Sequence, residues 1–282
     1  MNGTPSLARA AVDRDALTRD DPLALAAAWE RARVLVVEDG RALVDGTDLV
    51  LVGPEAAPSG DRFYLGSDAE SVYFAVAGPL PGRLDARPAG IREVGTVLSD
   101  RDTGLLVHAV GLANWHAAHP RCPRCGAPTE SIRGGAVRRC TAEGSEHFPR
   151  TDPAVIMLVT DGADRCVLGR QAGWPARRFS TLAGFVEPGE SAEMAVVREV
   201  AEETGLPVTD VRYSASQPWP FPASLMLGFT ARTDGSGLPH AKDGELEDAR
   251  WFTREQLRDG KEVLLPPPVS IAWRLLMDWL ES

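Results

Sequence analysis

The residues with the clearest capacity for chemistry are glutamates, and they lie in one short segment, residues 184–206, which reads GFVEPGESAEMAVVREVAEETGL. Glu199, Glu202 and Glu203 stand at positions i, i+3 and i+4, so on a helix their side chains share one face. Like charges so close together destabilise an isolated helix, whereas a cation bound among them would stabilise it. Carboxylate oxygens are the ligands that Mg²⁺ and Mn²⁺ prefer. The spacing therefore indicates a site for a hard divalent cation.

The ordinary explanation of such a segment is a solvated acidic helix. Glutamate is a good helix former, Glu190 lies near the expected N-terminus, and Gly205 is a typical C-terminal stop. That explanation does not account for Gly184, for Arg198, or for the fixed distances in sequence between these residues and the glutamates. The segment matches the Nudix box, G-x5-E-x7-R-E-U-x-E-E-x-G-U with U apolar, at every specified position. The resemblance implies hydrolysis of a nucleoside diphosphate linked to another group.

Three cysteines upstream of this segment have the spacing of a zinc ribbon. Cys122 and Cys125 form a C-x-x-C knuckle, and Cys140 follows after fourteen residues. A C-x-x-C pair alone is compatible with redox chemistry, but a third cysteine at this distance favours a structural zinc ion. The register places Glu143 where a fourth ligand is expected, whereas His147 is the chemically better zinc ligand, so both stay candidates.

A second motif, SQPWPFPAS at residues 216–224, lies just downstream of the acidic segment. Its three prolines favour an extended loop, and Trp219 and Phe221 provide rigid flat surfaces. Such a loop can be a purely structural plug. Behind a zinc ribbon, however, it resembles the hallmark of the NADH pyrophosphatase (NudC-type) subfamily of Nudix hydrolases.

Composition describes the cellular setting. The chain has 282 residues, a net charge of −10 and four cysteines. The overall charge does not favour nucleic acid or an anionic membrane. No signal segment or membrane-spanning apolar run is visible, and the cysteine pattern indicates a reducing compartment, so we expect a cytoplasmic protein without a membrane partner. Cys166 lies in an apolar run and is interpreted as a core residue.

Around these motifs the pattern predicts an α+β chain with three domains. They are a β-rich N-terminal domain (1–119) closed by a helix over 102–119, the zinc ribbon (120–150) and a Nudix α/β/α sandwich on a mixed sheet (151–282). In the last domain we expect a hairpin around residues 161–162, strands near 207–214, 224–232 and 249–252, and helices near 253–259 and 268–281.

The resemblance implies roles for individual residues. Glu199, Glu203 and Glu245 would bind Mg²⁺ or Mn²⁺ together with the carbonyl of Ala183, and Glu203 or Glu202 would act as the base. Phe148 stands where the family has a tyrosine. The substrate would contact Phe148, Phe185, Gln217, Pro218, Trp219, Pro220, Phe221, Pro222, Ala223, Ser224 and Ala272. Gly184, Glu190, Arg198 and Gly205 would be structural, with Arg198 pairing with Glu190.

The activity that the resemblance implies is hydrolysis of NAD(H) to NMN(H) and AMP by a homodimer. Two or three Mg²⁺ or Mn²⁺ ions would act at each site, and one structural Zn²⁺ would bind to each subunit. Removal of NAD caps from RNA is the same chemistry, and arginines 121, 124, 133, 138, 139 and 150 make the ribbon region locally basic. The alternatives are ADP-ribose or dinucleoside polyphosphates as substrates, and a non-catalytic regulator that uses the fold as a ligand sensor.

Overall fold

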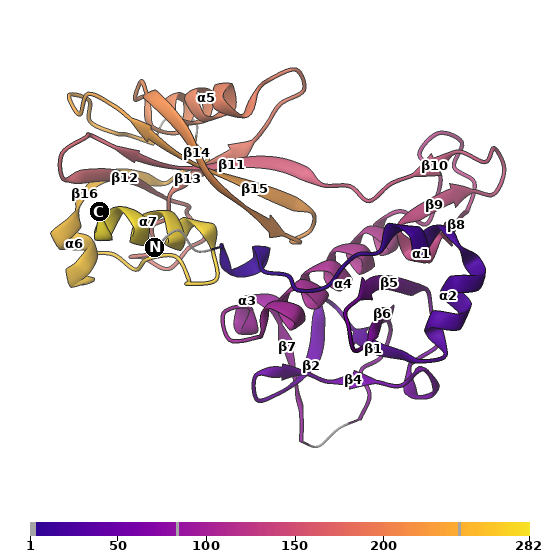
Figure 1. Ribbon diagram of the computed structural model, residues 1–282. Helices are drawn as coiled ribbons and strands as arrows, with labels where there is room; N and C mark the ends of the chain where they lie inside the picture. Colours follow the sequence, from indigo (N-terminus) through magenta and orange to yellow (C-terminus); the bar gives the residue numbers. More distant parts are fainter. Residues whose placement is uncertain (1–3, 83–84, 242–243) are drawn as a thin grey trace. The chain divides into compact units, whose positions relative to one another are not determined.

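The computed structural model describes residues 4–82, 85–241 and 244–282 and divides the chain into two compact units (Figure 1). The C-terminal unit consists of the residues up to Ala8, Asp152–Pro218 and Ser224–Ser282. The N-terminal unit consists of Arg9–Thr151 and the short segment Trp219–Ala223. The 120–150 segment, predicted as a separate ribbon domain, is thus grouped with the N-terminal unit, and its independence stays a prediction.

The N-terminal unit begins with a β-rich region, as its alternating apolar runs predict. Its strands are β1 (Ala32–Val37), β2 (Arg41–Asp45), β3 (Asp48–Leu49), β4 (Leu51–Val52), β5 (Arg62–Ser67), β6 (Val72–Ala77) and β7 (Arg87–Gly90). They form one sheet of order β4-β1-β6-β5 and another of order β3-β2-β7. Val34 of β1 and Phe74 of β6 are partners in register, and both pack with Trp29 in one buried cluster. Burial of alternate apolar side chains therefore holds this region together.

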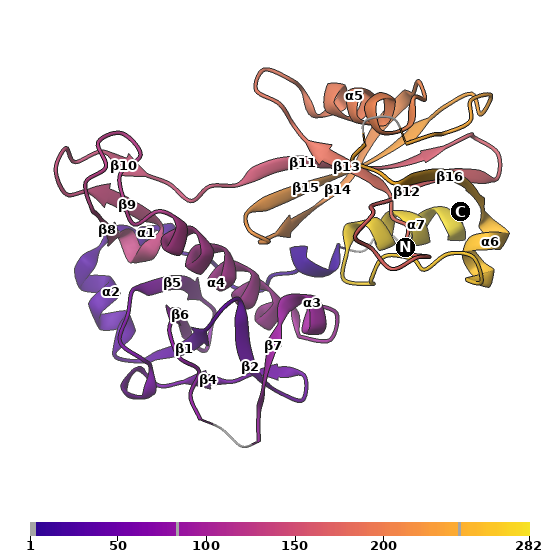
Figure 2. The same ribbon diagram turned by 180° about the vertical axis from the view of Figure 1, so that it is seen from behind.

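Helices flank these sheets (Figure 2). The helical segments of this unit are α1 (Ala16–Asp20), α2 (Pro22–Trp29), η2 (Pro54–Ala56), α3 (Ile91–Val94) and α4 (Asp100–Ala118), while the short η1 (Ser6–Ala8) belongs to the C-terminal unit. Helix α4 confirms the helix predicted over 102–119. Helix α2 was not predicted, although its signal is local: the Asp21 side chain accepts hydrogen bonds from two backbone N–H groups of the first turn, and Pro22 follows directly.

The cysteine-containing segment forms a small antiparallel sheet of its own. It consists of β8 (Thr129–Ile132), η3 (Arg133–Gly135), β9 (Val137–Cys140) and β10 (Glu146–His147), in the strand order β10-β9-β8. Cys140 ends β9, and the chain reverses after it, because Gly144 adopts a positive φ of 73°. Within the turn that follows Cys140, the Glu143 N–H lies 3.5 Å from the Cys140 sulfur.

The C-terminal unit is built on a six-stranded mixed sheet. Its strands are β11 (Asp152–Thr160), β12 (Arg165–Arg170), β13 (Leu182–Phe185), β14 (Thr209–Trp219), β15 (Ser224–Arg232) and β16 (Asp248–Thr253). The order is β14-β15-β11-β12-β16, and β13 pairs with β11. Strand β11 runs parallel to β15 and antiparallel to β12 and β13. The predicted hairpin and strands are confirmed, and β14 extends further than expected.

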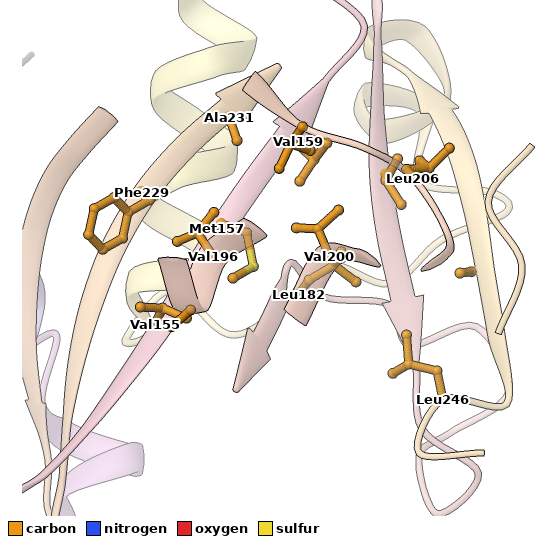
Figure 3. Close-up of a cluster of buried hydrophobic side chains, with 14 residues drawn as sticks. Val155, Met157, Val159, Leu182, Val196, Val200, Leu206, Phe229, Ala231 and Leu246 are labelled. Atoms are coloured by element: carbon orange, nitrogen blue, oxygen red, sulfur yellow. The ribbon is translucent and has the colours of Figure 1, made fainter. Parts of the chain in front are cut away.

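Three helices cover the two faces of this sheet: α5 (Ala192–Thr204) on one side, with α6 (Arg254–Asp259) and α7 (Ile271–Glu281) on the other (Figures 1 and 2). Alternate β11 residues divide between two cores. Val155 and Met157 pack with Val196 and Val200 of α5 (Figure 3). Their neighbours on β11 pack against α7 in a second cluster. The predicted α/β/α sandwich is confirmed, because each face of the mixed sheet buries its own apolar cluster.

None of the helices within the described ranges is both long enough and apolar enough to cross a membrane.

Candidate active site and metal centres

The acidic segment forms strand β13, a loop and helix α5. The Ser191 side chain accepts a hydrogen bond from the Met194 N–H and caps the start of α5, and Gly205 ends the helix with a φ of 74°. Strand β13 passes directly beneath this helix. A β-carbon at Gly184 would lie 1.9 Å from Cδ of Glu199, so only glycine leaves space for that carboxylate. The first glycine of the motif is therefore explained by the close approach of β13 to α5.

The carboxylates on this face of α5 differ in exposure. Glu199 is 8 % exposed and Glu203 is 3 % exposed, whereas Glu202 is exposed to solvent. Burial raises the pKa of the Glu199 carboxyl, and the hydrogen bond from Arg198 opposes that rise. The negative charges of Glu202 and Glu245 raise the pKa of Glu199 further. The structure therefore places Glu245, which lies far downstream of α5 in the sequence, close enough for its charge to act on Glu199.

Arg198 lies at the centre of the hydrogen-bond network. Its Nε and Nη2 donate to the two carboxylate oxygens of Glu190 at 2.9 and 2.8 Å, which is the predicted pair. Nη1 also donates to Glu199 at 2.8 Å and to Glu202 at 3.0 Å, and Nη2 donates to the Phe185 carbonyl at 2.9 Å. The bond to Glu190 is the largest of the causes that raise the pKa of Arg198. One guanidinium thus joins the loop, β13 and α5.

The segment that carries Glu245 is held by a residue that the sequence analysis missed. Arg170, at the end of β12, forms an ion pair with Glu247, and the Glu247 N–H donates to the Arg170 carbonyl at 2.8 Å. Arg170 also donates to the Trp174 carbonyl at 2.8 Å. Leu246, between the two glutamates, is buried in the core under α5. No spacing in the sequence relates Arg170 to Glu247, because strand pairing brings them together.

The residues predicted to contact substrate lie in three settings. Phe148 and Phe185 are 62 % and 60 % exposed. Gln217 is 0 % exposed and donates through Nε2 to the Val269 carbonyl at 3.2 Å, while Ala272 is a buried residue of α7. The residues of the motif from Trp219 to Ala223 belong to the N-terminal unit. A shared substrate pocket for these residues stays a prediction.

The zinc ribbon brings four potential ligands together. The Sγ atoms of Cys122, Cys125 and Cys140 and a carboxylate oxygen of Glu143 all lie within 4.8 Å of one another. The Sγ atoms of Cys125 and Cys140 are 3.4 Å apart, and the Cys122 Sγ is 3.2 Å from Glu143 Oε1. A tetrahedral zinc ion with bonds of about 2.3 Å separates its ligand atoms by about 3.8 Å. The donor set and its size therefore fit one zinc ion.

His147, the other candidate for the fourth ligand, lies outside this group of described residues. Its Nε2 is 3.2 Å from the hydroxyl of Ser145, and that hydroxyl donates to Glu143 Oε1 at 2.7 Å. The histidine therefore contacts the cluster through Ser145, and the geometry favours Glu143 as the ligand.

The thiols of Cys122, in the ligand group, and of Cys166, outside it, lie in different environments. Burial by itself raises the pKa of Cys122, but the backbone N–H groups of Cys125 and Arg124 outweigh it and lower the pKa to about 7. Such a thiol releases its proton readily to a metal ion. Cys166 is fully buried in the core under α7, and burial raises its pKa, so the expectation of a core residue is confirmed.

The sandwich and the carboxylates of α5 define a protein of the Nudix hydrolase class, and the NUDIX domain family model matches residues 150–271. The family model described as the NADH pyrophosphatase zinc ribbon domain matches residues 117–148. The NAD-capped RNA hydrolase NudC of Mycobacterium bovis is 40% identical over 300 residues, covering 99% of this chain and 96% of the relative. The chain belongs to the NudC family of Nudix hydrolases.

Two further similarities extend beyond the mycobacterial relatives. The human NAD-capped RNA hydrolase NUDT12 is 42% identical over 227 residues, covering 75% of this chain and 46% of that protein. The crystal structure of a NUDIX hydrolase from Nitrosomonas europaea has a TM-score of 0.46 and 20% sequence identity, covering 57% of this chain and 90% of that one.

Proposed function

We propose that this protein hydrolyses the pyrophosphate bond of NAD(H) to give NMN(H) and AMP, and that it removes NAD caps from RNA by the same reaction. The observation that carries the proposal is the buried carboxylate of Glu199 packed on Gly184, with Glu202 and Glu245 close enough to raise its pKa. The names of the mycobacterial and human relatives, both NAD-capped RNA hydrolases, support the choice of substrate.

The donor set of the site fits Mg²⁺ or Mn²⁺. Glu199, Glu203 and Glu245 offer carboxylate oxygens, and Ala183, beside Gly184 on β13, offers a backbone carbonyl. We propose two or three ions per site with these ligands. When bound, such ions neutralise pyrophosphate charge and lower the pKa of water.

The side chains of the chain itself would then divide the remaining tasks. A carboxylate oxygen of Glu203 or Glu202 would take the proton of the attacking water. Arg198 would keep the Glu199 carboxylate in position through its 2.8 Å hydrogen bond, while its two bonds to Glu190 fix the loop. Phe185, exposed at the end of β13, would stack on a base or on the nicotinamide ring.

The zinc ribbon would have a structural task. Three thiolates and the Glu143 carboxylate would surround one Zn²⁺ per subunit and leave it no open position for substrate. Such an ion would hold β9 and the turns on either side of it together, because the 120–150 segment has a small apolar core of its own.

The RNA part of the proposal depends on the relatives and not on a basic surface. Arg138 is buried and donates to Thr129 and to His116. Arg139 forms an ion pair with Glu130 at 2.6 Å, and Arg133 lies 3.6 Å from a Glu146 carboxylate oxygen. Arg133 and Arg139 therefore each have a carboxylate partner, and Arg138 is not available at the surface.

Parallel kinetics on NADH, NAD⁺, ADP-ribose and a short NAD-capped RNA, each with Mg²⁺ and with Mn²⁺, test the proposal. We expect the NAD-containing substrates to have a kcat/KM at least about tenfold above that of ADP-ribose, the difference that one or two specific contacts supply. A preference for ADP-ribose would favour the alternative substrate class. No turnover of any substrate would favour the non-catalytic regulator.

A homodimer and a cytoplasmic location complete the proposal. A cluster of three cysteines suited to zinc, with a fourth cysteine in the core, is typical of proteins in a reducing compartment. Light scattering during size-exclusion chromatography tests the dimer, and a monomer at working concentration would refute it. Fractionation of cells tests the location, and recovery of the protein with the membranes or outside the cell would refute that part.

A further inference from the structure

The middle of the 216–224 motif is a proline-containing turn with few backbone donors of its own. Strands β14 and β15 are hydrogen-bonded neighbours, and the turn between them, residues 220–223, contains Pro220 and Pro222, which have no N–H to donate. Within this turn, the Phe221 N–H donates to the Trp219 carbonyl at 2.7 Å. The carbonyl of Pro220, a buried residue, therefore needs a donor from elsewhere, and that of the exposed Pro222 is open to one.

Asn114 on α4 supplies those donors. Its Nδ2 donates to the Pro220 carbonyl at 3.0 Å and to the Pro222 carbonyl at 3.4 Å. One turn earlier on the same helix, a β-carbon at Gly111 would lie 3.9 Å from Cβ of Pro220, and Pro220 is buried. The i, i+3 spacing of Gly111 and Asn114 thus presents a small surface and an amide donor to the same proline.

Arg92 on α3 holds the aromatic side chains. Its guanidinium carbon lies 4.1 Å from the ring centroid of Phe221 and 5.1 Å from that of Trp219. The two rings pack edge to face, with centroids 5.1 Å apart and an interplanar angle of 72°. One cation therefore contacts both rings, an arrangement that fixes their orientation through cation–π attraction.

We propose that Arg92 and Asn114 are positioning residues for the 216–224 motif, so that substrate selection in the hydrolase depends on the N-terminal unit. Pro218 and Ser224, on either side of the held segment, belong to the C-terminal unit. The inference rests on the proposed function, in which this motif selects the dinucleotide. It assigns a task to the N-terminal unit, in which the sequence reveals no catalytic motif.

A measurement without substrate tests the contact. Hydrogen exchange of a peptide covering residues 216–224 is compared in wild type, Arg92→Ala and Asn114→Asp, which is isosteric but lacks the amide donor. Arg33→Ala, which removes an exposed arginine of β1 in the same unit, is the control. We expect exchange to be roughly tenfold faster in the two variants and unchanged in the control. Unchanged exchange in all variants would overturn the proposal, whatever the substrate is.

Kinetics with NADH test the consequence. For Arg92→Ala we expect KM to rise about two- to fivefold, with kcat within about twofold of wild type, because only binding is weakened. Arg92→Lys, which keeps a cation over the rings, should recover part of the change. For Asn114→Asp we expect KM to rise roughly tenfold, since two donors are lost and a charge faces the carbonyls.

Phe221→Ala distinguishes failure of the anchoring inference from failure of the proposed function of the motif. If it raises KM while Arg92→Ala and Asn114→Asp match Arg33→Ala, the motif selects substrate without these anchors and the inference is wrong. If Phe221→Ala also leaves KM unchanged, the motif does not select the dinucleotide. The proposed function then loses its support from the motif, and the inference loses its premise. Circular dichroism of each variant establishes that the fold is retained.

Discussion

The Cα atom of Gly184 and the carboxylate of Glu199 are in such close contact that no side chain fits at position 184. A β-carbon there would lie 1.9 Å from Cδ and 2.0 and 2.3 Å from the two carboxylate oxygens of Glu199. The glycine at position 184 is therefore required by the carboxylate of Glu199, which packs directly on the backbone of β13.

Gly184→Ala is expected to displace that carboxylate. A shift of about 1 Å in a catalytic group costs roughly 100-fold in rate, so turnover of NADH should fall by about that factor. Calorimetric titration with Mn²⁺ should show weakened binding. Gly173→Ala is the control, because a β-carbon at Gly173 meets no atom within 4 Å. Near-normal turnover in Gly184→Ala would show that the helix relaxes and that the close approach is not needed.

Glu203→Gln keeps the size and removes the charge of a nearly buried side chain. We expect kcat to fall by roughly 100- to 10,000-fold, the range for loss of a general base, while the thermal unfolding midpoint stays close to that of wild type. Glu193→Gln, in the exposed first turn of the same helix, should behave as wild type. Normal activity in Glu203→Gln would exclude Glu203 both as a base and as a metal ligand.

Arg170→Gln is expected to loosen the segment that carries Glu245, because the ion pair with Glu247 is lost. Residues that orient metal ligands typically contribute 10- to 100-fold to affinity, so Mn²⁺ binding measured by electron paramagnetic resonance should weaken by about that factor. The matched variant Arg212→Gln changes an exposed arginine of β14 and should leave affinity unchanged. Equal affinities in the two variants would mean that the Glu245 segment needs no support from Arg170.

The fourth zinc ligand can be decided by comparing Glu143→Ala with His147→Ala. Because Glu143 lies within the ligand group and His147 contacts it through Ser145, Glu143→Ala should lose zinc more readily to a chelator. Zinc per chain, measured by mass spectrometry after mild chelation, should remain near one for His147→Ala. The reverse order would make the histidine the ligand.

His108 on α4 provides a pH prediction. Its pKa is lowered from 6.5 to about 3, mainly by burial and further by the charges of Arg14 and Arg19. A hydrogen bond with the Leu65 backbone opposes this lowering. The folded state therefore keeps the ring neutral, whereas the unfolded chain binds a proton below pH 6.5. The contribution to stability is present above that pH and is lost as pH falls toward 3.

Between pH 7.5 and pH 5 this difference amounts to a loss of up to about 2 kcal/mol in the free energy of unfolding. Chemical denaturation of the full chain at both pH values measures it. His108→Gln, which does not titrate, should show a loss smaller by about that amount. An identical pH dependence in wild type and variant would mean that folding does not lower the pKa of His108 and that the ring is protonated at pH 5 in the folded protein.

Local patterns in the sequence predicted most strands of the C-terminal unit and the helices α4 to α7, together with the chemistry of single segments, although helix α2 was missed. Helix α5 has its cap at Ser191, its stop at Gly205 and its acidic face in one continuous stretch, so the spacing of Glu199 and Glu203 predicts the face they share. The cysteine spacing likewise predicts the cluster of Cys122, Cys125 and Cys140, because knuckle and turn are local structures.

Contacts between distant segments depended on the tertiary structure. Arg170 contacts Glu247 through strand pairing, and Asn114 contacts the carbonyls of Pro220 and Pro222, which are more than a hundred residues away in the sequence. The conformation of the turn after Cys140 places Glu143, and not His147, within the group of potential zinc ligands. A single sequence records periodicity and turn chemistry, but not which surfaces pack together. Such packing is set by burial summed over the whole chain, and it decided which side chains hold the predicted motifs in place.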